Sequence, residues 1–306
     1  MTTRELALRT DEAVELGHAY VQAVSARHSI RVLFIKGPSL DRLGLRNNHV
    51  SSDVDALVDP TRFQDLLDAL LTSGWQRRPT RLSERVSARH AVTLIHPQWP
   101  CDIDLHHSFP GFLLSPERVF SALWEDRIEL PFAHQLCAVP SRAGSTLVFA
   151  LHLLRNGMRG ERDRQSFAVL TSAVLPDNER QALALLAQST GCTSTLRDFL
   201  SALRVTADPP EDEATSLALR EWRASVKAGS HGAYHWVTAI RAARPSERPQ
   251  LLARAVWPSR ADLATKWPSR PLGPMRRVAV RLARLGGGLR HLPVAVAAIF
   301  PYRTRD

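Results

Sequence analysis

The sequence has few cysteines, which disulfide-stabilised proteins and zinc ribbons need. It holds three cysteines in 306 residues, Cys101, Cys137 and Cys192, and no CxxC pair. This odd number without paired spacing argues against a disulfide framework and a zinc ribbon, and indicates a reducing compartment. The sequence contains no GxSxG segment, so it does not predict the nucleophile elbow of an α/β-hydrolase. The glycine run at 286–288 lacks the strand and lysine of a P-loop, so we expect a flexible turn there.

Long apolar runs are also missing. The longest, at 292–300, has nine residues, whereas a membrane span needs about 20. The first 16 residues contain acids and no apolar core, so we expect no signal peptide. Apolar residues make up 44% and charged residues 23% of the chain, which is typical of a globular protein. We therefore expect a soluble, cytoplasmic protein.

Positive charge is concentrated at the end of the chain. Residues 270–306 hold eight arginines and one acid, a balance of +7 out of the total of +10. Within them, Arg277, Arg281 and Arg284 repeat at helical spacing beside Val278 and Leu282. This pattern predicts a short basic amphipathic helix. Such a helix docks on the protein's own core, on an anionic lipid surface or on nucleic acid.

Hydrophobic periodicity predicts an α+β fold. We expect helices at 10–28 and 59–74, strands at 30–36 and 52–58, and a hairpin of strands at 91–97 and 101–109. This order predicts a domain with a small mixed sheet over residues 1–135. After Pro140 the spacing is helical, so residues 136–306 are expected to be a mainly helical region with a basic C-terminal tail.

Two of these strands carry aspartates at alternate positions. Alternate side chains of a strand project to the same side, so Asp53 and Asp55 share a face, as do Asp102, Asp104 and His106. Carboxylates brought together repel one another unless a cation lies between them. Oxygen ligands favour Mg²⁺ or Mn²⁺, and a pair of such ions promotes displacement at phosphorus. A solvated strand edge is the simpler reading of a single such pair.

The motifs IKGPSL at 35–40, SSDVDALV at 51–58 and CDIDLHHSF at 101–109 resemble the polymerase-β-like nucleotidyltransferase superfamily. Within it, the chain resembles the bacterial family of uncharacterised nucleotidyltransferases marked by a KG turn, an SDxDxLV strand and a later DLH strand. The motifs cover about a quarter of the chain. The resemblance implies a polymerase-β-like catalytic core at 1–135.

The resemblance also implies roles for individual residues. Gly37 and Ser39 would belong to the turn that holds the nucleotide phosphates, and Ser52 would join the nucleotide contacts. Asp53 and Asp55 match the metal-binding pair.

The third carboxylate of the family, a metal ligand and general base, falls on the second strand. Strand parity does not choose between Asp102 and Asp104. The DLH match selects Asp104, with Asp102 in reserve. The implied cofactor is Mg²⁺ or Mn²⁺, with two ions.

The chain departs from the family pattern at two positions. Members usually carry an arginine a few residues before the DxD pair, where this chain has His49, and Arg46 lies three residues earlier. A neutral histidine grips a triphosphate less well than the forked guanidinium of arginine. Pro38 removes one backbone N–H from the phosphate turn.

Other side chains have both a functional and a structural interpretation. Lys36 either contacts phosphate or reaches solvent. His106 either touches the acceptor, orients the carboxylate or makes a structural hydrogen bond. A zinc site from the chain's histidines has no recognisable ligand spacing. His152, Arg155 and Arg159 share one side of an expected helix, which either closes over the triphosphate or faces solvent.

The expected function is a Mg²⁺-dependent nucleotidyltransferase. It would move a nucleoside monophosphate from an NTP to an acceptor and release pyrophosphate. The acceptor would be a sugar, a small metabolite, a modified peptide or tRNA. The alternative is a catalytically inactive protein of the same fold that serves as a nucleotide-binding or interaction module, which His49 and Pro38 favour.

Overall fold

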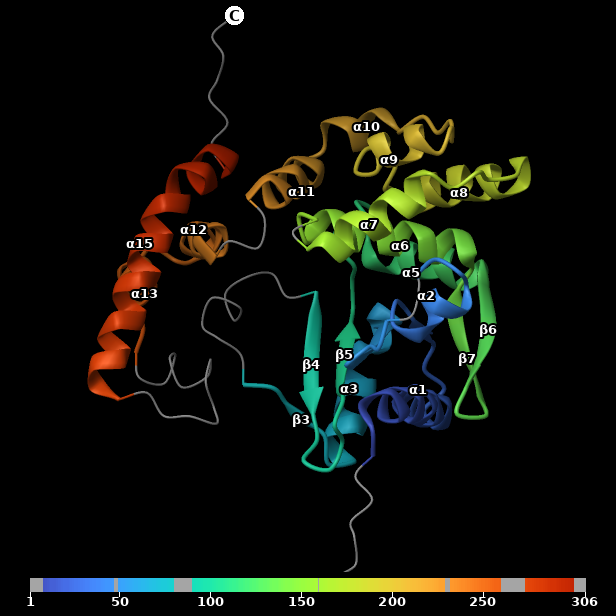
Figure 1. Cartoon of the computed structure of the whole chain (residues 1–306), viewed down its shortest axis with the longest axis horizontal. Helices are drawn as coiled ribbons and strands as arrows, with labels where there is room; N and C mark the ends of the chain where they lie inside the picture. Colours follow the sequence, from blue (N-terminus) through green and yellow to red (C-terminus); the bar gives the residue numbers. More distant parts are fainter. Residues whose placement is uncertain are drawn as a thin grey trace, which may run out of the picture. The chain divides into compact units, whose positions relative to one another are not determined.

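The computed structural model describes residues 8–46, 49–79, 90–158, 160–228, 232–259 and 273–299. The chain divides into two compact units, each described here by itself. The first comprises Met1–Arg78, His90–Leu154 and Met158–Leu219, and the second Pro79–Arg89, Arg155–Gly157 and Arg220–Asp306. The predicted α+β class is confirmed: among the described residues, all strands lie before residue 141 and only helices follow (Figure 1). The predicted division of the chain at residue 135 stays a prediction.

The first unit is built on a five-stranded sheet in the order β1-β2-β5-β4-β3. The strands are β1 (Val32–Phe34), β2 (Asp53–Val58), β3 (Gln76–Arg77), β4 (Ala91–Ile95) and β5 (Asp102–His106). β2 pairs with β5 in parallel, and the other neighbours are antiparallel. The sheet is therefore mixed, and the predicted hairpin is confirmed as β4 and β5.

One face of this sheet is the main core of the unit. The buried side chains of Val54, Ala56, Ile103 and Leu105 belong to one apolar cluster together with residues of α1 (Thr10–Arg27) and α3 (Phe63–Thr72). Between α1 and β2 the approach is close at Gly17, because a Cβ there would lie 2.8 Å from Val54 Cγ2. The helix can therefore rest directly on the strand that carries Asp53 and Asp55.

Several elements of this unit were not expected from the sequence. Residues 38–42, predicted as a turn, form the short helix α2 (Pro38–Arg42), and a 3₁₀ turn, η1 (Pro60–Arg62), precedes α3. After α5 (Pro116–Glu125), β6 (Arg127–Phe132) and β7 (Gln135–Pro140) form a separate antiparallel hairpin. Phe132, Cys137 and Val139 of this hairpin extend the main core. All three cysteines are free and buried.

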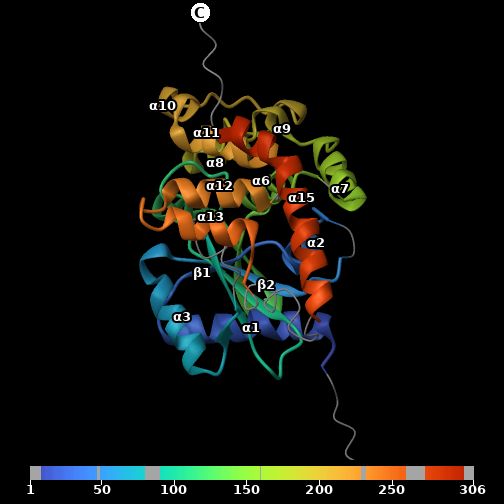
Figure 2. The same ribbon diagram turned by 90° about the vertical axis from the view of Figure 1, so that its left-hand side faces the viewer.

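Helices make up the rest of the described chain. They are α6 (Arg142–Arg155), α7 (Glu161–Thr171), α8 (Asp177–Thr190), α9 (Arg197–Ala202), α10 (Glu211–Thr215), α11 (Leu217–Ala228), α12 (Gly232–Ala242), α13 (Arg248–Val256) and α15 (Pro274–Ile299). In the second unit, α12 packs against both α13 and α15 (Figure 2). In the described part of the chain, no helix is long and apolar enough to cross a bilayer.

The basic helix near the end of the chain is longer than predicted. α15 runs through the glycine run at 286–288, so the expected flexible turn there is wrong. A glycine costs a helix about 1 kcal/mol relative to alanine, and strong helix formers on both sides can offset that cost. Residues 270–272 and 300–306 of the predicted basic tail lie outside the described residues.

Candidate functional site

The candidate site is the face of the sheet opposite α1, where β2 and β5 run side by side. Their register pairs Asp53 with Asp102, Asp55 with Asp104 and Leu57 with His106. Alternation then sends the polar side chains to one face and the apolar ones to the core. As predicted, Val54, Ile103 and Leu105 are fully buried. The parallel pairing of two neighbouring strands therefore aligns the two DxD motifs.

Asp55 is the most enclosed carboxylate of this face. It is only 4% exposed, and its Oδ1 lies 2.6 Å from Lys36 Nζ and 2.8 Å from His106 Nε2. Burial by itself would raise the pKa of Asp55, but the Lys36 ammonium and the His106 hydrogen bond outweigh it and hold the pKa well below its ordinary value. Asp55 is thus ionised and already partnered by a cation.

His106 is held by this carboxylate. Burial lowers its pKa in spite of the neighbouring Asp55, so a neutral imidazole donates Nε2–H to Asp55 Oδ1. Its other nitrogen, Nδ1, is buried and has no hydrogen-bond partner among the described residues. This contact fits two of the roles considered from the sequence, orienting a carboxylate and making a structural hydrogen bond.

Three side chains of this face are grouped closely enough to ligate one metal ion. Ligand atoms of Asp55, Asp104 and His106 all lie within 4.8 Å of one another. Asp104 Oδ1 is buried and accepts no hydrogen bond from any described residue, so its lone pairs are available to a cation. Carboxylate oxygens together with an imidazole suit a divalent ion such as Mn²⁺, and Mg²⁺ when carboxylates dominate.

Asp53 lies on the same face but outside this group. Burial, together with the charges of Asp55 and Asp104, raises its pKa to about 6. A carboxyl with a pKa raised by its neighbours' charges is one that a bound cation would return to its ionised form. The donor set therefore fits a divalent cation.

Asp102 is engaged differently from Asp104. It forms an ion pair with Arg78 and is partly exposed. Burial raises its pKa despite the arginine. Of the two carboxylates that strand parity left open, the structure groups Asp104 with Asp55 and directs Asp102 toward an arginine.

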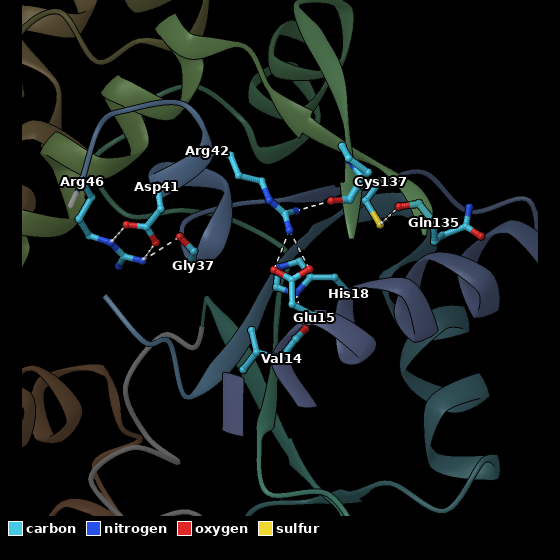
Figure 3. Close-up of polar contacts among 10 residues, drawn as sticks. Val14, Glu15, His18, Gly37, Asp41, Arg42, Arg46, Gln135 and Cys137 are labelled. Atoms are coloured by element: carbon cyan, nitrogen blue, oxygen red, sulfur yellow. Dashed lines mark hydrogen bonds and ion pairs between the residues drawn. The ribbon is translucent and has the colours of Figure 1, made fainter. Parts of the chain in front are cut away.

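The predicted phosphate turn has a specialised backbone. Lys36 and Gly37 have positive φ angles of 64° and 58°, and Gly37 ψ is −145°, a conformation that glycine adopts without a steric penalty. The buried Ser39 donates its hydroxyl hydrogen to the Lys36 carbonyl at 2.5 Å. Arg46 donates to the Gly37 carbonyl at 2.8 Å and to Asp41 Oδ2 at 2.9 Å (Figure 3). Arg46 therefore holds the turn together.

His49, which replaces the expected arginine, is itself linked to an arginine. Arg162 Nη1 of α7 donates to His49 Nδ1 at 3.2 Å. Burial, and then the charges of Arg46 and Arg162, lower the pKa of His49, so it is neutral and can accept this bond. Arg162 was not identified from the sequence, because 113 residues separate it from His49 and no local pattern joins them.

A second histidine, His18 of α1, lies behind the phosphate turn and was also not identified. Its Nδ1 donates to the Val14 carbonyl at 2.7 Å (Figure 3). Its ring stacks on Phe132, with 4.5 Å between the ring centroids. A Cβ at Gly37 would lie 3.9 Å from the His18 ring. Burial lowers the pKa of His18 to about 4, so this neutral ring is a wall against which the turn packs.

The remaining predicted residues lie elsewhere. Ser52 is exposed, and its carbonyl accepts the backbone N–H of Asp102 at 3.2 Å. Arg155 is the last residue of α6 and belongs to the second unit. His152 lies one turn earlier in α6, and Arg159 lies outside the described residues. The predicted cluster of these three side chains therefore stays a prediction.

A cavity of about 270 Å³ opens elsewhere in the first unit. It is bounded by Gly44 and Leu45, directly after α2, and by side chains of α6, α7 and α8. None of the carboxylates of the candidate site lines it. The clustered ligands, rather than this cavity, therefore define the candidate site.

The comparisons with known proteins find likeness among solved structures and none in sequence. No protein-family model and no curated protein matches the sequence. Among solved structures, the chain is similar to an antigenic nucleotidyltransferase-like protein from Paracoccidioides brasiliensis, with 16% sequence identity and a TM-score of 0.37. The likeness covers 66% of this chain and 96% of that chain. The bacterial family expected from the motifs stays a prediction, and the proposed function rests on the geometry of the site.

Proposed function

We propose that this protein is a metal-dependent nucleotidyltransferase of the polymerase-β-like superfamily. The observation that carries the proposal is the in-register pairing of two DxD strands, which aligns Asp53 and Asp55 with Asp102 and Asp104. Four carboxylates and a histidine on one face are costly unless a function requires them. The neighbouring turn with its positive φ angles supplies what a phosphate group would need.

The metal ligands in this proposal are Asp53, Asp55 and Asp104. His106 holds Asp55 in its ligating orientation, which is a usual role for a group hydrogen-bonded to a ligand. When bound, Mg²⁺ or Mn²⁺ would offset the carboxylate charges and withdraw electrons from the α-phosphate. The unpartnered Asp104 Oδ1 and the raised pKa of Asp53 are the features that support this assignment.

The chain's other residues would bind and orient the triphosphate. Gly37 and Ser39 shape the turn so that its backbone approaches the phosphates. Lys36 is near enough to Asp55 to exchange that partner for a phosphate oxygen. Arg162, held by His49, provides the forked cation that the sequence lacks at position 49.

The chemistry that follows is transfer of a nucleoside monophosphate. Asp104 would accept the proton of the acceptor hydroxyl. The acceptor oxygen would then bond to the α-phosphorus as the bond to the β-phosphate oxygen breaks, with pyrophosphate as the leaving group. A sugar, a small metabolite, a modified peptide or tRNA would serve as acceptor, since each presents a hydroxyl or phosphate oxygen.

One observation favours the alternative of a catalytically inactive protein. Lys36 already supplies a positive charge 2.6 Å from Asp55, as a permanent replacement for a metal ion would. A protein of this kind would use the same fold to bind nucleotide or a macromolecular partner without turnover.

The test is incubation of the purified chain with each α-labelled NTP, Mg²⁺ or Mn²⁺, and a cell extract. We expect label to move to an acceptor in a metal-dependent reaction. Asp53→Asn and Asp104→Asn should lower the rate by about 10²–10³-fold, because each removes a ligand and a charge. Asp65→Asn, an exposed carboxylate on α3, is the matched control and should behave as the wild type.

Two results would change this assignment. Loss of activity in Asp102→Asn with full activity in Asp104→Asn would move the third carboxylate to Asp102. Nucleotide binding without label transfer, with every NTP and extract, would establish the inactive alternative.

A further inference from the structure

The feature that the proposed function does not use is the surface of α13 and α15. Surface helices usually bury their apolar stripe and expose their charged one. On α15, Met275, Val278 and Leu282 follow the i, i+3, i+7 spacing of a single helix face, and this face is open to solvent. Their exposed fractions are 87%, 44% and 56%.

Two arginines of α15 are partly covered by their surroundings. Arg277 and Arg281 are half-buried, and the Arg281 guanidinium donates to the Pro258 carbonyl at 2.9 Å. It also lies over the Trp257 ring, 4.8 Å from the ring centroid. On this part of α15, apolar side chains are therefore exposed, while the guanidinium groups of Arg277 and Arg281 are partly covered and Arg276 is exposed.

The neighbouring helix α13 has the same character. Leu251 is buried, whereas Leu252 and Val256 are about half exposed, as is Trp257 directly after the helix. Arg281 joins Trp257 to α15, and α13 and α15 are in contact. We call these six side chains the outward face: Leu252, Val256, Trp257, Met275, Val278 and Leu282.

We propose that the outward face docks on an anionic lipid membrane. Its exposed apolar side chains would enter the acyl boundary, while the guanidinium groups stay at the depth of the headgroup phosphates. Trp257, beside Arg281, has the amphipathic ring that gathers at membrane interfaces. This proposal is independent of nucleotidyl transfer.

The charge of this region favours an anionic membrane over a second copy of the chain or nucleic acid as the partner of the outward face. Residues 220–306 hold 17 Lys and Arg against 4 Asp and Glu, a net charge of +13, so a second copy would meet a surface of like charge. Nucleic acid is bound chiefly through cations, whereas α15 presents Met275, Val278 and Leu282 to solvent with Arg276 beside them. An anionic bilayer meets both the apolar face and the charge.

The experiment is sedimentation of the full chain with phosphatidylcholine vesicles, with and without phosphatidylglycerol. We expect binding to the anionic vesicles that weakens as salt rises, and little binding to neutral ones. The double variant Val278→Glu/Leu282→Glu should reduce this binding by at least about tenfold. Leu185→Glu/Leu217→Glu adds the same charge at exposed leucines of α8 and α11, and should bind within about twofold of the wild type.

A fluorescent probe distinguishes membrane docking from self-packing. Because the three native cysteines are buried, an environment-sensitive dye can be placed on Met275→Cys, with the exposed Val174→Cys as control. We expect a blue shift at position 275 only when anionic vesicles are added. A dye that is already blue-shifted without vesicles, vesicle binding unchanged in Val278→Glu/Leu282→Glu, or binding to nucleic acid with none to vesicles would each overturn the proposal.

Discussion

The two parts of the chain use charge in opposite ways. Residues 1–219 hold 23 Lys and Arg against 26 Asp and Glu, close to balance, whereas residues 220–306 have a net charge of +13. In the first part, cations are joined to carboxylates across the fold, as in the pairs Arg31–Asp59, Lys36–Asp55, Arg42–Glu15, Arg46–Asp41 and Arg142–Glu179.

The exposed cations of α11 have no such partners. Arg220, Arg223 and Lys227 share one side of the helix, and none of them forms an ion pair with a described residue. Charge in the first part fixes the positions of side chains around a sheet. In the second part, these three exposed cations of α11 face solvent.

The largest effects are expected from variants that each remove the proposed function of one part of the chain. Asp104→Asn should lower label transfer by about 10²–10³-fold and leave vesicle binding unchanged. Val278→Glu/Leu282→Glu should do the reverse. Both activities are measured on each purified variant, and a variant that loses both would show that the two parts are not functionally separate.

The next largest effect concerns the buried ion pair of the site. Lys36→Met leaves Asp55 buried without its cation, so the free energy of unfolding should fall by about 3–5 kcal/mol. Millimolar Mn²⁺ or Mg²⁺ should recover part of this loss, because a divalent ion can replace the missing charge. Urea denaturation with and without metal measures both effects. In Arg78→Met, whose pair with Asp102 is more exposed, the loss should stay under about 1 kcal/mol.

A pH-dependent effect is expected from His18. Its pKa is about 4 in the folded protein and 6.5 when unfolded, so between these values the unfolded state binds the extra proton. The stability that neutral His18 contributes is complete above pH 6.5 and is lost as the pH falls toward 4, by roughly 3 kcal/mol.

His18→Phe should remove this pH dependence, because the ring keeps its place beside Phe132 and no longer titrates. Denaturation midpoints at several pH values between 4 and 7 give the slope. His134→Asn alters an exposed histidine of the β6–β7 turn and should leave the slope as in the wild type. An equal slope in His18→Phe would contradict the assignment.

The smallest effect tests whether an ion pair on the surface of the first unit contributes to its stability. Arg62 pairs with Asp65 at 2.5 Å on the surface, where both side chains are about half exposed. Arg62→Ala should change the free energy of unfolding by no more than about 0.5 kcal/mol. A loss above about 1 kcal/mol in urea denaturation would show that surface pairs also stabilise the first unit.

Elements with strong periodicity could be predicted from the sequence. The apolar alternation around Asp53 and Asp55 gave β2 and its facing, and the DIDLH segment gave β5. The hairpin β6–β7 was not predicted: Arg127 to Leu130 alternate polar and apolar residues, but Pro131 follows at once, and a proline inside a run argues against a strand. The turn expected at 286–288 was wrong because local propensity gave way to the surrounding helix.

The carboxylates of the site could be predicted, and their partners could not. Alternation along a strand places Asp53 and Asp55 on one face whatever the rest of the fold. The contact of Lys36 with Asp55 depends on positive φ angles at Lys36 and Gly37, and the contact of Arg162 with His49 depends on how α7 packs. Neither leaves a periodic signal in the sequence.

Because α1 approaches β2 closely, a purely apolar substitution in the helix can disturb the carboxylates of the site. At position 17 even a methyl group would press on Val54, which lies between the two aspartates of the DxD pair. A Gly17→Ala change would alter no charge and no hydrogen bond, yet either the helix or Val54 between the two carboxylates would have to shift. A substitution at position 17 that looks conservative can therefore abolish the proposed activity.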